Sequence, residues 1–193
     1  MILWIARLRA SIVLSQIVSP GATRNFTIAA QSSRDATAIH WNFKQRSGAM
    51  ITGSCLCRGV RYEIEGDIGP ALNCHCSMCR KVTGAAFRSR VAIPSENFRW
   101  TAGEDLLTRY ASSPGTIRTF CRVCGATLVS LFDDNPKTLG LAMGTLDSDP
   151  GVRPTFHVFV GSKAPWFEIT DDLPQFDAFP PASMAQKDGS LSK

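Results

Sequence analysis

All seven cysteines of the chain lie in three short clusters. The clusters are Cys55-Leu56-Cys57, Cys74-His75-Cys76-Ser77-Met78-Cys79 and Cys121-Arg122-Val123-Cys124. An odd number of cysteines cannot pair completely as disulfides, and partners separated by a single residue would close strained rings. Zinc prefers thiolate ligands, which it binds in tetrahedral sites with Zn–S distances of about 2.3 Å. The cysteines therefore predict zinc binding in a reduced protein.

Two of the clusters can close one four-thiolate site. Cys121 and Cys124 form a turn that is followed by Gly125, which can take the left-handed backbone that lets amides point at sulfur. Such a pair needs a second pair, and Cys55 and Cys57 can supply it. We expect this site to be structural, because it would tie the first strands to the middle of the sheet. A structural zinc can contribute on the order of 10 kcal/mol to folding.

The central cluster offers three thiolates, from Cys74, Cys76 and Cys79, and leaves a fourth tetrahedral position for another ligand. An open position distinguishes catalytic zinc from structural zinc, and a water, a substrate oxygen or a substrate thiol can fill it. The alternative is that His75, His157 or an acidic residue completes a purely structural site. Because His75 lies between two of the ligands, we expect its side chain to point away from the metal.

The clusters sit among short β-like segments that glycine and proline separate. Residues 59–64 alternate apolar and charged side chains, as a strand with one buried face does. Further predicted strands are residues 87–93, 106–110, 117–121, 127–132, 138–143 and 156–160. One helical turn is predicted at residues 77–83, with Ser77 as its cap and Gly84 at its end. The pattern favours an all-β sandwich or barrel-like domain.

The net positive charge of the chain lies in its first 49 residues. The formal net charge is +5, but residues 1–49 hold six basic residues and one acidic residue, so residues 50–193 hold 15 of each and are neutral. A nucleic-acid-binding zinc ribbon is therefore disfavoured. We expect residues 1–49 to be an extension, either sequence before a translation start at Met50 or a disordered or targeting segment. Residues 50–180 would form the domain and residues 181–193 a flexible tail.

The apolar runs and the thiols of the sequence indicate in which cellular compartment the protein belongs. No apolar run reaches the roughly 18 to 20 residues that a spanning helix needs, so no membrane partner is expected. Cysteines that bind zinc need a reducing compartment, which predicts the cytoplasm, or the mitochondrion if the extension is a genuine targeting segment. The sequence leaves the oligomeric state open.

The cysteine clusters and their neighbours resemble a known family. The matching segments are GSCLCRGVRYE (53–63), CHCSMCRK (74–81) and FCRVCG (120–125), followed by His157, Lys163 and Trp166. In this order they resemble the glutathione-dependent formaldehyde-activating enzymes, also called the centromere protein V/GFA domain family. The resemblance covers roughly residues 50–176 and leaves the extension outside it.

The resemblance implies a fold, two metal sites and a reaction. The fold would be a β-tent, a mainly antiparallel zinc-bound domain. The resemblance implies one structural zinc on Cys55, Cys57, Cys121 and Cys124, and one catalytic-type zinc on Cys74, Cys76 and Cys79. The implied reaction combines formaldehyde and glutathione into S-hydroxymethylglutathione, which is a carbon-sulfur lyase reaction in the reverse sense. The implied partner is thus a small thiol or aldehyde.

The chain departs from the family pattern at two places. Arg58 stands where the first cysteine turn usually has glycine, which adds a charge near the structural site. Ala85 and Ala86 stand where a serine often follows the glycine after the central cluster. The second change lies beside the predicted active site and bears on the identity of the substrate.

Four cations follow the central cluster and are candidates to bind the two carboxylates of glutathione. They are Arg80, Lys81, Arg88 and Arg90, and their alternative role is a solvated strand face. His157 is a candidate general acid or base, because its ordinary pKa lies in the physiological range. The rival function is a non-catalytic, zinc-stabilised binding module in which the central cluster is structural or buffers metal.

Overall fold

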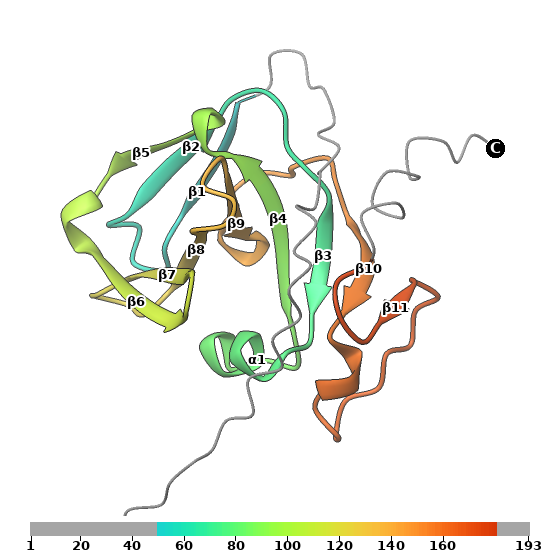
Figure 1. Ribbon diagram of the computed structural model, residues 1–193. Coiled ribbons are helices and arrows are strands. Elements are labelled where there is room, and N and C mark those ends of the chain that lie inside the picture. Colours follow the sequence, from blue (N-terminus) through green and yellow to red (C-terminus); the bar gives the residue numbers. More distant parts are fainter. Residues whose placement is uncertain (1–49, 181–193) are drawn as a thin grey trace, which may run out of the picture. The chain divides into compact units, whose positions relative to one another are not determined.

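The computed structural model describes residues 50–180, and the predicted extension (1–49) and tail (181–193) lie outside the described residues. The described part is mainly β with one α-helix, as the sequence predicts. Its strands form two sheets (Figure 1). None of the helices in this part is both long and apolar enough to cross a membrane.

The small sheet is antiparallel and has three strands in the order β1-β2-β5. Its strands are β1 (Ile51–Ser54), β2 (Arg61–Ile64) and β5 (Phe98–Ala102). Tyr62 is buried in its centre and packs against the rings of Phe98 and Trp100. The turn between β1 and β2 carries the first cysteine cluster, so this hairpin positions Cys55 and Cys57.

The large sheet has eight strands in the order β11-β10-β3-β4-β9-β8-β7-β6. Their bounds are β3 (Ala71–Cys74), β4 (Arg88–Pro94), β6 (Leu107–Ser113), β7 (Thr116–Cys121), β8 (Thr127–Phe132), β9 (Thr138–Ala142), β10 (Pro154–Val158) and β11 (Gln175–Phe176). Neighbouring strands are antiparallel, except that β10 runs parallel to both β3 and β11. Three-residue 3₁₀ helices in the described part are Ser95–Asn97, Glu104–Leu106, Met143–Thr145 and Val160–Ser162.

The main hydrophobic core is built from both sheets. Its buried side chains include Ile51, Tyr62 and Ile64 from the small sheet and Ala71, Val91, Ile93, Leu139 and Leu141 from the large sheet. Successive side chains of a strand point to opposite faces. Because Ala71 packs in the main core, Leu72 and Cys74 of β3 point to the other face of the large sheet. We call the face to which Leu72 and Cys74 point the outer face of the large sheet.

The one α-helix of the described residues, α1 (Ser77–Thr83), follows β3 directly. Its bounds match the prediction, and Gly84 ends it in a left-handed conformation with φ 64°. The predicted cap at Ser77 is wrong. The sulfur of Cys76 accepts the hydrogen bond from the Cys79 amide and caps the helix instead, because the chain turns into the helix one residue earlier.

Most predicted strands are present, with some shifts at their ends. Strand β8 has the predicted bounds, whereas β10 begins and ends two residues before the predicted segment 156–160. It ends early because Phe159 has a left-handed backbone with φ 59°, which breaks the extended conformation. Strand β3 was not predicted, since all four of its residues are buried and its sequence does not alternate.

Candidate functional site

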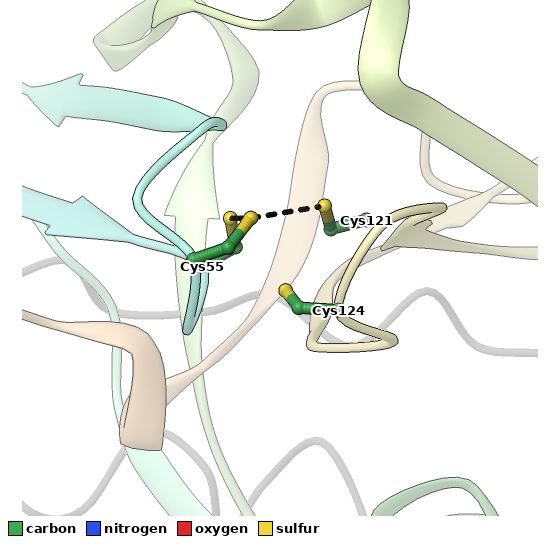
Figure 2. Close-up of side chains that lie close together, drawn as sticks. Cys55, Cys121 and Cys124 are labelled. Atoms are coloured by element: carbon green, nitrogen blue, oxygen red, sulfur yellow. Dashed lines mark hydrogen bonds between the residues drawn. The ribbon is translucent and has the colours of Figure 1, made fainter. Parts of the chain in front are cut away.

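The first and third cysteine clusters meet at one place. Cys55 and Cys57 come from the β1–β2 turn, Cys121 from the end of β7, and Cys124 from the turn that leads to β8. Figure 2 shows Cys55, Cys121 and Cys124 close together. The Cys57 sulfur lies 3.4 Å from that of Cys55 and 3.9 Å from that of Cys121. All four sulfurs lie within 4.8 Å of one another. The structure therefore brings these four residues together across the two sheets.

One backbone hydrogen bond closes each of the two cysteine turns. The Arg58 amide donates to the Cys55 carbonyl at 2.8 Å, and the Gly125 amide donates to the Cys121 carbonyl at 2.8 Å. Both donors have left-handed backbones, with φ 60° at Arg58 and φ 73° at Gly125. The left-handed conformation expected of Gly125 is confirmed. The same conformation at Arg58 explains physically why glycine suits this position.

The spacing of the four sulfurs suits a tetrahedral zinc ion. Sulfurs at about 2.3 Å from a tetrahedral centre lie about 3.8 Å from one another. The distances of 3.4 and 3.9 Å in the cluster are close to this value. The Val60 amide donates a hydrogen bond to the Cys55 sulfur at 3.3 Å and so helps to orient this sulfur as a ligand. The donor set therefore fits zinc.

The second cluster gathers Cys74, Cys76 and Cys79, whose sulfurs also lie within 4.8 Å of one another. Cys74 ends β3, Cys76 caps α1, and Cys79 lies in the first turn of that helix. Within the described residues, no histidine or acidic side chain joins this group as a fourth ligand. The described residues therefore bring together three possible metal ligands at this cluster.

The pKa values of the sulfurs in this cluster shift in opposite directions. Hydrogen bonds from the Cys74 and Cys76 side chains lower the pKa of Cys79, and the positive charges of Arg118 and Arg88 lower it further. Hydrogen bonds with the Cys76 and Cys79 side chains, together with burial, raise the pKa of Cys74. The surroundings of the cluster thus stabilise a thiolate, the form that binds metal.

The four predicted cations lie in different surroundings. Arg88 is buried at 2% exposure, and its guanidinium donates to Ser130 Oγ at 2.7 Å and to the Gly140 carbonyl at 3.1 Å. Arg80 donates through Nε to the His75 carbonyl at 3.3 Å, and Lys81 is exposed on α1. Whether any of them binds a carboxylate stays a prediction.

Arg90 stacks between two aromatic rings. Its guanidinium carbon lies 5.5 Å from the centre of the Phe132 ring and 5.1 Å from that of Phe179. In the strand pairing it faces Leu72, and Arg88 faces Cys74. Side chains of paired residues project from the same face of a sheet. Arg88 and Arg90 therefore share the outer face with the three-cysteine cluster.

Arg118 on β7 is a charged residue near the cluster that the sequence analysis does not single out. It is buried at 6% exposure, and its Nη2 lies 3.9 Å from the Cys79 sulfur. Its Nε donates to Ser112 Oγ at 3.1 Å. Arg118 is 39 residues from Cys79 in the sequence, so only the strand pairing could have linked the two.

His157 is buried and belongs to a hydrogen-bonded chain of side chains. Its Nδ1 lies 2.7 Å from Nε2 of His75, and its Nε2 lies 3.1 Å from an Asp171 oxygen. The His75 ring contacts Phe87 and Phe167 as well, and it is absent from the group of possible metal ligands among the described residues. The role of His157 as an acid or base stays a prediction, and Asp171 was not anticipated.

A cavity of about 410 Å³ lies between α1 and the turn that carries Cys124. Its lining includes Leu56, Thr83, Phe87 and Arg88. The three clustered cysteines are not among the lining residues. The cavity therefore adjoins the four-cysteine cluster and does not itself define a substrate position at the three-cysteine cluster.

Two comparisons with known proteins give the same family name. A family model described as "Glutathione-dependent formaldehyde-activating enzyme" matches residues 50–162. A protein of Colletotrichum graminicola, named "Putative glutathione-dependent formaldehyde-activating enzyme", is 26% identical over 133 residues. The match covers 69% of this chain and 61% of that protein, so the chain spans less than two thirds of its relative. A crystal structure of a Rhodobacter sphaeroides protein matches with a TM-score of 0.44 and 25% identity, over 52% of this chain and 92% of that chain.

Proposed function

The chain belongs to the glutathione-dependent formaldehyde-activating enzyme family, and on that premise we propose that it is a zinc-dependent carbon-sulfur lyase acting on a glutathione adduct. The observation that carries this proposal is the three-sulfur cluster, which lacks a fourth ligand among residues 50–180. A purely structural site would have this position filled by the chain. A β-tent domain over residues 50–180 and a reducing compartment such as the cytoplasm complete the proposal.

The two clusters divide the metal binding between them. Cys55, Cys57, Cys121 and Cys124 would hold a structural zinc that ties the small sheet to the large one. Cys74, Cys76 and Cys79 would hold a second zinc with an open position. When bound there, zinc would act as a Lewis acid toward an aldehyde oxygen or keep a substrate sulfur in its thiolate form.

The reaction that fits the family is the addition of a thiol to formaldehyde. The glutathione thiol gives up its proton, its sulfur forms a bond to the carbonyl carbon, and the carbonyl π electrons move to oxygen. That oxygen then takes up one proton to give S-hydroxymethylglutathione. The reverse direction breaks the carbon-sulfur bond. No redox co-reactant is needed in either direction, which agrees with a site built only from sulfur ligands and cations.

The residues around the cluster would contribute positioning and charge. Arg88 and Arg118 place positive charge beside the Cys79 sulfur, which favours thiolate at the site. Phe156, Phe159, Phe176 and Phe179 belong to the small hydrophobic cluster around Cys74 and Cys79. Apolar surroundings keep water away and strengthen electrostatic interactions at the site.

An exchange measurement tests this function directly. Two-dimensional exchange NMR on an equilibrium mixture of glutathione, formaldehyde and S-hydroxymethylglutathione reports how fast the adduct forms and breaks down. We expect zinc-loaded protein at micromolar concentration to raise the exchange rate well above the uncatalysed rate, and Cys76→Ser to remove the increase. An unchanged rate with folded, zinc-loaded protein would favour the non-catalytic binding module instead.

A further inference from the structure

Three arginines converge on the outer face beside the three-cysteine cluster. Arg88 hydrogen-bonds to Ser130 of β8 and to the carbonyl of Gly140 of β9. Arg118 is paired with Ser130 in the strand register, and it reaches the Cys79 sulfur. Arg90 lies over Gly140, where an added methyl group would come within 3.3 Å of its Nη1 atom. The three guanidinium groups thus share one small region.

None of these arginines forms a salt bridge with a carboxylate among residues 50–180. Over this range the ion pairs are Arg99 with Glu63, Arg153 with Asp149, and His157 with Asp171. Buried charges are normally paired, because burial of an uncompensated charge is costly. In addition, Nε of Arg88 is buried and has no hydrogen-bond partner. Among residues 50–180, no carboxylate therefore supplies negative charge to this region.

The thiolates of the cluster offset this charge only in part. Three thiolates around one divalent metal ion carry a formal charge of −1, whereas three arginines carry +3. The excess of two positive charges lies in partly apolar surroundings, since Arg90 is sandwiched between Phe132 and Phe179. A ligand with two negative charges would balance the site.

We propose that Arg90 and Arg118, supported by Arg88, form a carboxylate-binding subsite beside the three-cysteine cluster, which selects thiols that carry carboxylates. This subsite deepens the proposed function and rests on it for the identity of the thiol. Arg118 and Arg90 are the binding residues. Arg88 is a positioning residue, because its donors already serve the sheet.

Two further cations that follow the cluster in sequence, Arg80 and Lys81, do not belong to this subsite. Arg80 is engaged with the carbonyl of His75, and Lys81 is exposed on α1. Both therefore fall outside the subsite, although they follow the cluster directly. A bidentate guanidinium suits a carboxylate better than an ammonium group does.

Thiol binding to cobalt-substituted protein tests the proposal. A Co²⁺ ion bound by thiolates has visible absorption bands that change when another thiol binds, and titration of these bands gives a Kd. The probes are glutathione, its glycine monoethyl ester and N-acetylcysteamine, which carry two, one and no carboxylates. For the unaltered chain we expect glutathione to bind at least tenfold more tightly than N-acetylcysteamine, with the ester between them.

Variants show whether the arginines cause this preference. Arg90→Gln should reduce the preference for glutathione at least tenfold, with an unchanged Kd for N-acetylcysteamine. Arg118→Gln should reduce the same preference, and because Arg118 also contacts the Cys79 sulfur, its effect is read from the ratio of the two Kd values. Arg90→Lys should restore part of the preference. Arg109, exposed on the neighbouring β6, provides the matched control Arg109→Gln, which should change nothing. Because Arg118 is buried, Arg90→Gln keeps the test valid if Arg118→Gln does not fold.

The outcomes separate this proposal from the proposed function. Succinate, which has two carboxylates and no thiol, should raise the thermal midpoint of the unaltered chain and of Arg109→Gln, but not of Arg90→Gln. If succinate behaves in this way while no thiol changes the cobalt bands, the subsite stands and the thiol-lyase function falls. If thiols bind and exchange proceeds with the same carboxylate preference in every variant, the function stands and the subsite is overturned.

Discussion

Nε2 of His75 lies 2.7 Å from Nδ1 of His157, and both rings are buried. His157 in turn contacts Asp171 through Nε2 at 3.1 Å. A carboxylate only accepts hydrogen bonds, so in a neutral His157 ring Nε2 donates to Asp171 and Nδ1 accepts from Nε2–H of His75. Nδ1 of His75 is then a bare lone pair, and it has no partner among the described residues. Asp171 thereby sets the tautomers of two rings next to the central cluster.

The tautomers of these two rings can be measured. Burial, reinforced by His157, lowers the pKa of His75 to about 4, so its ring is neutral at pH 7. We expect ¹⁵N NMR to show both rings protonated at Nε2. In Asp171→Asn the amide can donate to His157 instead, which would reverse both tautomers and lower the thermal midpoint. A His75 ring protonated at Nδ1 in the unaltered chain would contradict this network.

Arg58 provides a test of backbone strain at the four-cysteine site. A non-glycine residue in the left-handed region costs roughly 1–2 kcal/mol, of which glycine's greater freedom in the unfolded chain offsets a part. Arg58→Gly should therefore stabilise the protein by about 0.5–1 kcal/mol in a denaturant titration.

Gly125 and Gly144 are matched controls for this effect, because an added methyl group meets no atom within 4 Å at either position. Only Gly125 has a positive φ. Gly125→Ala should cost about 1 kcal/mol and Gly144→Ala close to nothing. Equal effects at the two positions would show that backbone conformation does not control stability in this turn.

Serine substitutions distinguish the two cysteine clusters. Cys121→Ser should remove the structural metal and prevent stable folding, since this site joins the two sheets. Cys76→Ser should fold, because serine is a good helix cap and can still accept the hydrogen bond of the Cys79 amide. Circular dichroism and metal analysis check both variants. Equal loss of folding in both would indicate that the central cluster is structural.

Gly140 links the sheet to the arginine subsite. Its Cβ position lies 3.3 Å from both Nη1 of Arg90 and the Phe132 ring, so Gly140→Ala must displace one of them. We expect glutathione affinity to fall several-fold while the thermal midpoint changes by only a few degrees. Gly144→Ala is the control, and unaltered affinity in Gly140→Ala would argue against Arg90 as a binding residue.

The sequence predicts well those features that depend on local spacing. The bounds of α1 and β8 are correct because the helix end at Gly84 and the short apolar strand are local patterns. The cysteine groups could also be predicted, since few arrangements of seven thiols satisfy tetrahedral ligation. Arg118 and Asp171 could not be, because each reaches the site through pairing or loop contacts far along the chain. Arg88 appeared available to a ligand by its position in the sequence, yet the sheet takes up most of its donors.

Native mass spectrometry of the purified chain, with and without glutathione, tests the central claim most directly. It reports the number of metal ions and any retained thiol in one spectrum. The account predicts two zinc ions per chain and one retained glutathione, with Cys76→Ser keeping a single zinc and no glutathione. One firmly bound zinc in the unaltered chain, with no glutathione retained, would contradict it.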